Sequence, residues 1–271
     1  MIKTQRQSRI IDNVIFAIFG FVGILFFFLI VNAFDLEEYP IVEDWYATDI
    51  LFTILPVIVI ILGMILSVEY RFKGNHGKAW VFFTLAIMIW FVGELTYSYD
   101  TEVDPQDTST LTSDIFYISG YPLFFIFTIF YLKSRSKIIS RKMIVGAVIL
   151  STAFAIPSLY LTIGIDDELS DFEVLLYGTY PLLATLLLGP SIIAVSLFFR
   201  GHVGLLWLLM MMGTFTDIIA DTLYLTQEIE GSYGVGNMID VLYLWSYVFY
   251  ALGAWSFIRT YRDTVKQNQQ V

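Results

Sequence analysis

The chain has 271 residues, of which 57% are hydrophobic and 15% are charged, and its formal net charge at pH 7 is −10. A soluble domain carries about 25% charged residues, and the apolar residues here form runs of roughly 20, so we predict an all-α integral membrane protein. The lack of cysteine excludes disulfides, thiolate metal sites and a cysteine nucleophile, and two histidines in short basic loops exclude a histidine-rich metal site.

Eight apolar runs are long enough to cross the bilayer core, which is about 30 Å thick, as helices. In chain order they cover residues 11–33, 48–69, 79–98, 112–132, 142–164, 173–199, 204–226 and 235–258. The first run is too long for the apolar core of a signal peptide and has no small-residue cleavage site. We therefore predict eight transmembrane helices.

The segments between the runs alternate in charge. All 15 Lys and Arg residues fall on one side of the predicted membrane, and the acidic segments 35–44, 100–107, 166–173 and 227–231 fall on the other. Because basic loops stay in the cytoplasm, we predict a multi-pass plasma-membrane protein with both termini cytoplasmic and the acidic loops outside. Such an acidic face either keeps the surface hydrated or concentrates cations near it. Trp80 and Trp207 each open a run from the basic side, and we expect them at the membrane interface.

Four anchors indicate an internal repeat. GELTY (93–97) aligns with ADTLY (220–224) at an offset of 127, and DIFYISGY (114–121) aligns with DVLYLWSY (240–247) at an offset of 126. Trp80 and Trp207 are also 127 residues apart, and Pro56 and Pro181 are 125 apart. We predict two four-helix repeats, residues 1–136 and 137–271, with the same orientation and related by a pseudo-twofold axis along the membrane normal.

The repeated polar residues fall on single faces of the predicted helices, in the outer third of each span. A carboxylate that faces lipid costs on the order of 2–3 kcal/mol, so we expect these side chains to face the interior of the bundle. The candidate ligand- or cation-binding residues are Glu94, Tyr97, Asp114, Tyr117, Tyr121, Asp217, Asp221, Tyr224, Asp240, Tyr243 and Tyr247.

Each predicted hairpin brings two carboxylates together, Glu94 with Asp114 and Asp221 with Asp240. Lys and Arg are lacking on this side, and two like charges in a low-dielectric site cannot both stay ionised cheaply, so we expect each site to hold a proton or a cation. Three interpretations remain open. The groups are hydrogen-bonded contacts between helices, worth about 0.6–2 kcal/mol each; they form a ligand or cation site open to the outside; or they belong to a proton or ion pathway. The near absence of ionisable residues from the cytoplasmic halves of the helices argues against the pathway.

The hairpin with Glu94, Tyr97, Asp114, Tyr117, Gly120 and Tyr121 resembles the multi-pass membrane sensor regions of prokaryotic histidine kinases and diguanylate cyclases. The resemblance covers mainly residues 90–131 and the matching segment of the second repeat, residues 217–250. It implies a sensor that passes a signal to a cytoplasmic effector. After Ser256 only FIRTYRDTVKQNQQV follows, so a sensor of this kind needs an effector outside this sequence.

Catalytic signatures such as HExxH, GxSxG or a Walker motif do not occur in the sequence. We therefore predict a non-enzymatic membrane receptor or sensor-like module, without a cofactor or a metal, that carries an outward-facing acidic and tyrosine-rich site. The alternatives are a cation or small-solute transporter and a structural subunit of a membrane complex. The expected partners are the lipid bilayer and a cytoplasmic effector or an envelope partner, and nucleic acid is not expected.

Overall fold

The chain is described by a computed structural model over residues 18, 20–33, 47–102, 111–163, 171–199, 203–230, 232–234 and 236–268. Within these ranges the structure is helical and contains no strand. A short apolar helix, Gly20–Ala33, comes first. It is followed by α2 (Ala47–Glu69), α3 (Gly74–Glu102), α4 (Leu111–Lys133), the 3-10 turn η2 (Ser136–Ile138), α5 (Arg141–Ile163), α6 (Asp171–Phe198), α7 (Gly204–Ile229) and α8 (Asp240–Asn268).

Among the described residues, the seven helices α2 to α8 are long and apolar enough to cross a membrane. This confirms the predicted all-α, multi-pass membrane class. The remaining predicted span, 11–33, is described only as the shorter helix Gly20–Ala33, and most of its amino-terminal part lies outside the described residues. Two helices are longer than the predicted spans. Helix α3 begins at Gly74, before the predicted start at residue 79, and α8 ends at Asn268, after the predicted end at residue 258. Residues 259–268 contain no Gly or Pro, so nothing in this stretch breaks the helix.

The two ends of the bundle differ in charge. We call the end at which α2, α4, α6 and α8 begin the acidic end, because Asp49, Asp114 and Asp240 lie in the first turns of α2, α4 and α8. The opposite end, which includes Lys133 in the last turn of α4 and Lys137 in η2, is called the basic end.

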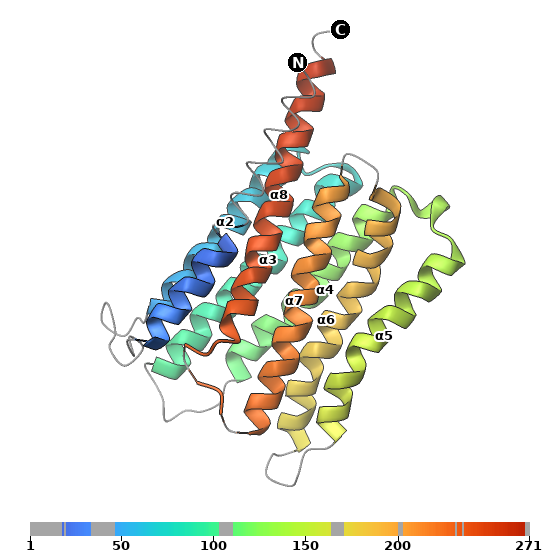
Figure 1. Cartoon of the computed structure of the whole chain (residues 1–271). Coiled ribbons are helices and arrows are strands. Elements are labelled where there is room, and N and C mark those ends of the chain that lie inside the picture. Colours follow the sequence, from blue (N-terminus) through green and yellow to red (C-terminus); the bar gives the residue numbers. More distant parts are fainter. Residues whose placement is uncertain are drawn as a thin grey trace.

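The helices pack in two matching sets (Figure 1). In the first set α3 contacts α2 and α4, and in the second set α7 contacts α6 and α8. The sets meet through two further contacts, α2 with α8 and α6 with α4. Each of these contacts turns into the other when α2, α3 and α4 are exchanged with α6, α7 and α8.

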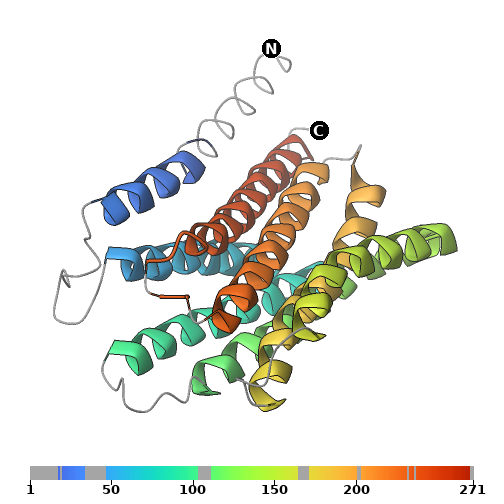
Figure 2. The same ribbon diagram turned by 60° about the horizontal axis from the view of Figure 1, so that its bottom comes forward.

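The first helix of each predicted repeat departs from this match. The helix Gly20–Ala33 packs against α2 and α8, where the Trp245 Nε1–H donates to the Phe21 carbonyl oxygen over 3.2 Å. By contrast, α5 packs against α6 and α7. These two helices lie at opposite edges of the bundle (Figure 2).

Aromatic side chains fill the middle of the bundle. The Phe127 ring lies 5.4 Å from Trp80 and 5.6 Å from Trp207, measured between ring centroids. Phe124 and Tyr250, which are 126 residues apart, contact each other with centroids 5.2 Å apart. Buried aromatic pairs of this kind contribute about 0.5–1.5 kcal/mol each beyond their burial. Trp80 and Trp207, expected at the membrane interface, are fully buried inside the bundle and do not face lipid, because Phe257 stacks on Trp80 and Tyr131 meets the edge of Trp207.

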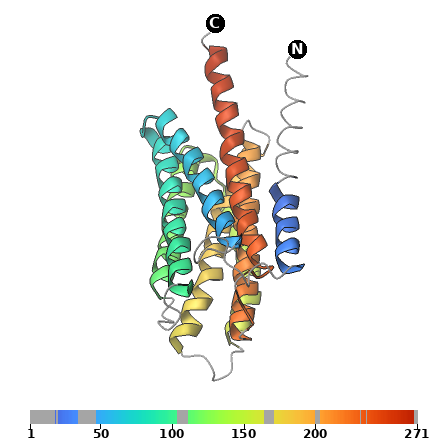
Figure 3. The same ribbon diagram turned by 90° about the vertical axis from the view of Figure 1, so that its left-hand side faces the viewer.

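The last helix, α8, runs from the acidic end through the bundle and continues past its neighbours at the basic end (Figure 3). Near the point where it leaves the bundle, the Arg262 Nε–H donates to Glu69 Oε1 on α2 over 2.6 Å. Tyr70 lies beside this pair, and burial together with the neighbouring Tyr261 and Glu69 raises the pKa of Tyr70 to about 12. Its hydroxyl therefore stays protonated at neutral pH.

Candidate functional site

A pocket of about 160 Å³ lies at the acidic end of the bundle. For scale, an engineered apolar cavity of about 150 Å³ in another protein binds benzene. Six carboxylates and eight tyrosines line the pocket, and no Lys, Arg or His is among the described residues that do so. The lining side chains of these two kinds are Asp49, Glu94, Asp114, Asp217, Asp221 and Asp240, and Tyr97, Tyr117, Tyr121, Tyr180, Tyr224, Tyr233, Tyr243 and Tyr247.

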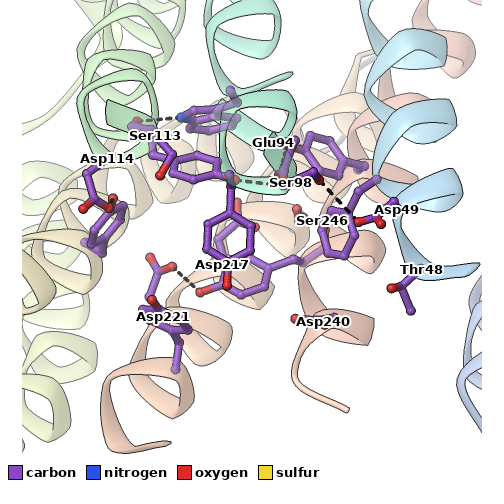
Figure 4. Close-up of a pocket in the computed structure, with 18 of the residues that line it drawn as sticks. Thr48, Asp49, Glu94, Ser98, Ser113, Asp114, Asp217, Asp221, Asp240 and Ser246 are labelled. Carbon is purple, nitrogen blue, oxygen red and sulfur yellow. Dashed lines mark hydrogen bonds between the residues drawn. The ribbon is translucent and has the colours of Figure 1, made fainter. Parts of the chain in front are cut away.

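All of the candidate residues predicted from the sequence line this one pocket. The sequence suggested a separate site at each hairpin, whereas the structure joins the two sets. The reason is the packing of α4 on α6 and of α2 on α8, which places the polar faces of the two hairpins against each other. In Figure 4, Asp114 and Asp221 lie on one side of the pocket, and Glu94 and Asp49 lie on the other.

Two carboxylates are held by tyrosines from both halves of the bundle. The Tyr117 hydroxyl donates to Glu94 Oε2 over 2.9 Å, and the Tyr247 hydroxyl donates to Glu94 Oε1 over 3.2 Å. In the second half, the Tyr243 hydroxyl donates to Asp221 Oδ1 over 2.9 Å. The Tyr121 hydroxyl donates to Asp221 Oδ2 over 3.0 Å. Each carboxylate thus receives one hydroxyl from its own hairpin and one from the other half.

This pattern differs from the expected pairing of Glu94 with Asp114. The hydrogen bonds to Glu94 come from α4 and α8, and Asp114 Oδ1 instead accepts from the Tyr180 hydroxyl on α6. The difference follows from the reach of the tyrosine side chain, which spans between helices that short carboxylates cannot bridge. Hydrogen bonds to an ionised acceptor are about twice as strong as those between neutral groups.

The two tyrosine hydroxyls on each of Glu94 and Asp221 can hold an ionised carboxylate, whose charge a cation in the pocket would neutralise. A carboxylate accepts at both oxygens, whereas a carboxylic acid carries a proton on one of them and donates from it. Here each of the two groups accepts a tyrosine hydroxyl at each oxygen. Buried negative charges are costly unless a positive charge accompanies them, and the described lining offers no basic side chain.

Asp114 carries an acceptor that the described protein does not use. Its side chain is 8% exposed, its Oδ1 accepts from Tyr180, and its Oδ2 is buried without a hydrogen-bond partner. Buried polar atoms are almost always hydrogen-bonded, so an unpartnered oxygen in a pocket wall needs an explanation.

The two halves of the pocket differ at its inner edge. In the second half, Tyr250 donates to Asp217 Oδ2 over 2.6 Å. At the matching positions of the first half stand Phe124 and Trp90, and the Trp90 Nε1–H donates to the Tyr117 carbonyl oxygen over 2.9 Å. The second half is therefore polar one turn deeper than the first.

Four acidic or tyrosine residues at the site were not among the sequence candidates: Asp49, Tyr180, Tyr233 and Tyr250. Asp49 Oδ1 accepts from the Ser98 hydroxyl over 3.3 Å, and Asp240 Oδ1 accepts from the Tyr233 hydroxyl over 2.8 Å. Burial, followed by the nearby charge of Asp240, raises the pKa of Tyr233 and keeps this hydroxyl a donor. Asp49, Tyr180 and Tyr250 align with apolar residues of the other half, and Tyr233 has no tyrosine counterpart, so the repeat pattern does not identify them. The position of Tyr180 next to Pro181, itself a repeat anchor, was the one signal for it.

Within the described residues, no group of three or more His, Cys, Asp or Glu side chains is arranged to hold a metal ion. The carboxylates are spread around the wall and are mostly occupied by tyrosine hydroxyls.

Comparison with protein-family models, with curated proteins and with solved structures finds no match to this chain.

Proposed function

We propose that the chain is a non-enzymatic membrane receptor or sensor-like module whose acidic, tyrosine-rich pocket binds a small cationic ligand. The observation that carries this proposal is the pocket itself, with six carboxylates, eight tyrosines and no basic side chain in its described lining. Tyrosine faces attract cations by about 0.5–2 kcal/mol each, and this attraction adds to that of the carboxylates.

Helix α8 supports a sensor over a scaffold. Asp240, Tyr243, Ser246 and Tyr247 all belong to its first turns and line the pocket. The same helix continues without a break to Asn268 at the basic end. A ligand that moves the first turns of α8 thus acts on a rigid element that reaches the opposite end of the bundle.

The proposed arrangement places the protein in the plasma membrane, with the acidic end outside and two parallel four-helix repeats, residues 1–136 and 137–271. The segregation of charge between the two sides supports the orientation. The crossed hydrogen bonds of Glu94 and Asp221, which exchange with each other at the offsets of 126 and 127, support the repeat. The resemblance to prokaryotic sensor regions remains a prediction and points in the same direction.

A transporter on the same framework is less well supported. Directly below the pocket the bundle is filled by Phe83, Phe124, Phe127, Trp80 and Trp207, all fully buried. A charged solute cannot pass such a packed apolar layer without a large rearrangement of the helices.

The test uses the absence of native cysteine. Lys266→Cys on α8 is labelled with an environment-sensitive fluorophore, and the purified protein is titrated with ethylammonium, tetramethylammonium or 1,4-diaminobutane. We expect at least one amine to raise the melting temperature and to change the emission saturably. The same label on Ser136→Cys, in η2 at the basic end, is the matched control and should respond less. Stabilisation without a change at position 266 would contradict the sensor, and uptake of the amine into proteoliposomes would favour the transporter.

A further inference from the structure

We propose that the ligand is a compact organic dication, a short α,ω-diamine whose two ammonium groups bind at Glu94 and Asp221. This inference rests on the proposed binding function and goes beyond it, because it names the ligand class and the two residues that select it.

The first argument is the matched construction of the two carboxylates. Glu94 and Asp221 line the same pocket, belong to different halves, and each accept two tyrosine hydroxyls at 2.9–3.2 Å. A carboxylate offers about four lone-pair sites, so each group keeps about two for further donors. A ligand with one cationic group neutralises one of these carboxylates and leaves its counterpart without a positive charge, whereas a diamine neutralises both.

The second argument is a further carboxylate in the lining of the same pocket. An ammonium group carries up to three N–H donors, and a carboxylate with a single free lone pair can accept one of them. Asp114 supplies such an acceptor in the same pocket, since its Oδ2 is buried and without a partner. This oxygen is an observation independent of the number of acidic residues, and a ligand ammonium group that reaches it would supply the donor that it lacks.

The third argument separates an organic dication from a metal ion. Ca²⁺ requires about 6–8 oxygen ligands converging at about 2.3–2.6 Å, and the described residues show no group arranged for a metal. A diamine requires separate carboxylates, with an apolar stretch between them for its methylene chain. Phe52 and Trp90 also line the pocket and provide apolar surface for such a chain. The volume of about 160 Å³ suits a ligand of about the size of one benzene ring.

The experiment compares diamines with monoamines of equal chain length. The purified full chain is titrated by calorimetry with 1,3-diaminopropane, 1,4-diaminobutane and 1,5-diaminopentane, and with propylamine, butylamine and pentylamine. We expect at least one diamine to bind more tightly than its matched monoamine by about tenfold or more, which corresponds to about 1.4 kcal/mol.

Glu94→Gln and Asp221→Asn test the two ends of the ligand. Each variant should reduce the affinity for the diamine to that for the monoamine, and the double variant should bind neither. Glu230→Gln is the control, because Glu230 is exposed at the same end and does not line the pocket. It should keep the preference for the diamine. Melting temperature and monodispersity establish that each variant is folded.

Two results overturn the inference in different ways. Equal affinity of the wild type for diamines and monoamines, with binding lost in the variants, would disprove the dication and leave the cation-binding function intact. Failure of all six amines to bind the folded wild type would reject both. If a variant does not fold, the comparison of diamines with monoamines on the wild type still decides the dication.

Discussion

At the residue scale, the site depends on hydroxyl groups as much as on carboxylates. The four oxygens of Glu94 and Asp221 each accept one tyrosine hydroxyl. Phenylalanine in these places would preserve the packing and remove the donors, so the tyrosines are needed for their O–H groups. Two of them, Tyr121 and Tyr247, join opposite halves of the bundle.

We predict that Tyr121→Phe and Tyr247→Phe destabilise the protein by similar amounts, about 1–3 kcal/mol each, because each leaves one carboxylate oxygen in the pocket wall without its donor. Thermal melting in one detergent measures the effect. Tyr160→Phe is the control and should stay within about 0.5 kcal/mol of the wild type, since Tyr160 on α5 is 77% exposed. Clearly unequal effects at positions 121 and 247 would contradict the matched roles of the two tyrosines.

A second prediction concerns the glycine that seats the Trp90 ring. A Cβ atom at Gly120 would lie 2.1 Å from Trp90 Nε1, and Trp90 is buried. We predict that Gly120→Ala lowers stability by about 1–3 kcal/mol, because a rigid ring must move. Gly146→Ala, where a Cβ meets nothing within 4 Å, should be neutral or stabilising by up to about 1 kcal/mol. Comparing the two melting curves checks this, and a stable Gly120→Ala protein would mean that Trp90 is free to shift.

At the scale of single elements, α8 combines two environments. Its first turns carry Asp240, Tyr243 and Tyr247 into the pocket, and its middle packs Ala254 and Phe257 in the core. Its last turns leave the bundle beside Glu69 of α2. The helix therefore has a fixed middle between a polar pocket and a polar tail.

The ion pair at this exit point should contribute little to stability. Arg262 is 54% exposed and Glu69 is 18% exposed at the side chain, and ion pairs with a solvent-exposed partner are worth about 0–1 kcal/mol. We predict that Glu69→Gln lowers the free energy of unfolding by no more than about 1 kcal/mol, and that salt reduces the difference. Melting curves at low and high ionic strength measure it. A larger loss would show that the pair fixes α8 against α2.

At the scale of the whole molecule, polar and apolar side chains occupy different levels along the bundle. Carboxylates and tyrosines gather around a pocket at the acidic end, and aromatic rings close the middle. The pocket therefore lies at one end of a bundle whose middle is closely packed.

The orientation of the bundle can be tested with single cysteines in a chain that has none. Glu230→Cys and Ser136→Cys lie at exposed positions of the acidic and basic ends. We predict that an impermeant thiol reagent labels position 230 and not 136 on intact cells, and that lysis makes position 136 reactive. The reverse pattern would place the acidic end in the cytoplasm.

The sequence by itself determined the class of fold and most of the carboxylate and tyrosine residues of the site. Long apolar runs dictate membrane helices, because each helix satisfies its own backbone hydrogen bonds in lipid, and helical spacing placed each set of candidate residues on one face. The intramembrane carboxylates Glu94 and Asp221 were recognisable as site residues because charged groups are costly in lipid and therefore face the interior of the bundle.

Only the tertiary structure decided how these residues meet. Helical spacing describes one helix at a time and cannot show that Tyr247 reaches Glu94 from a position 153 residues away. Two expected hairpin sites became one pocket, because α4 packs on α6 and α2 packs on α8. Likewise, Trp80 and Trp207 are of a residue type common at membrane interfaces, but they pack against the rings of Phe257 and Tyr131 in the core of the bundle. The identity of a neighbour across a helix interface depends on packing between distant segments, which local sequence patterns do not encode.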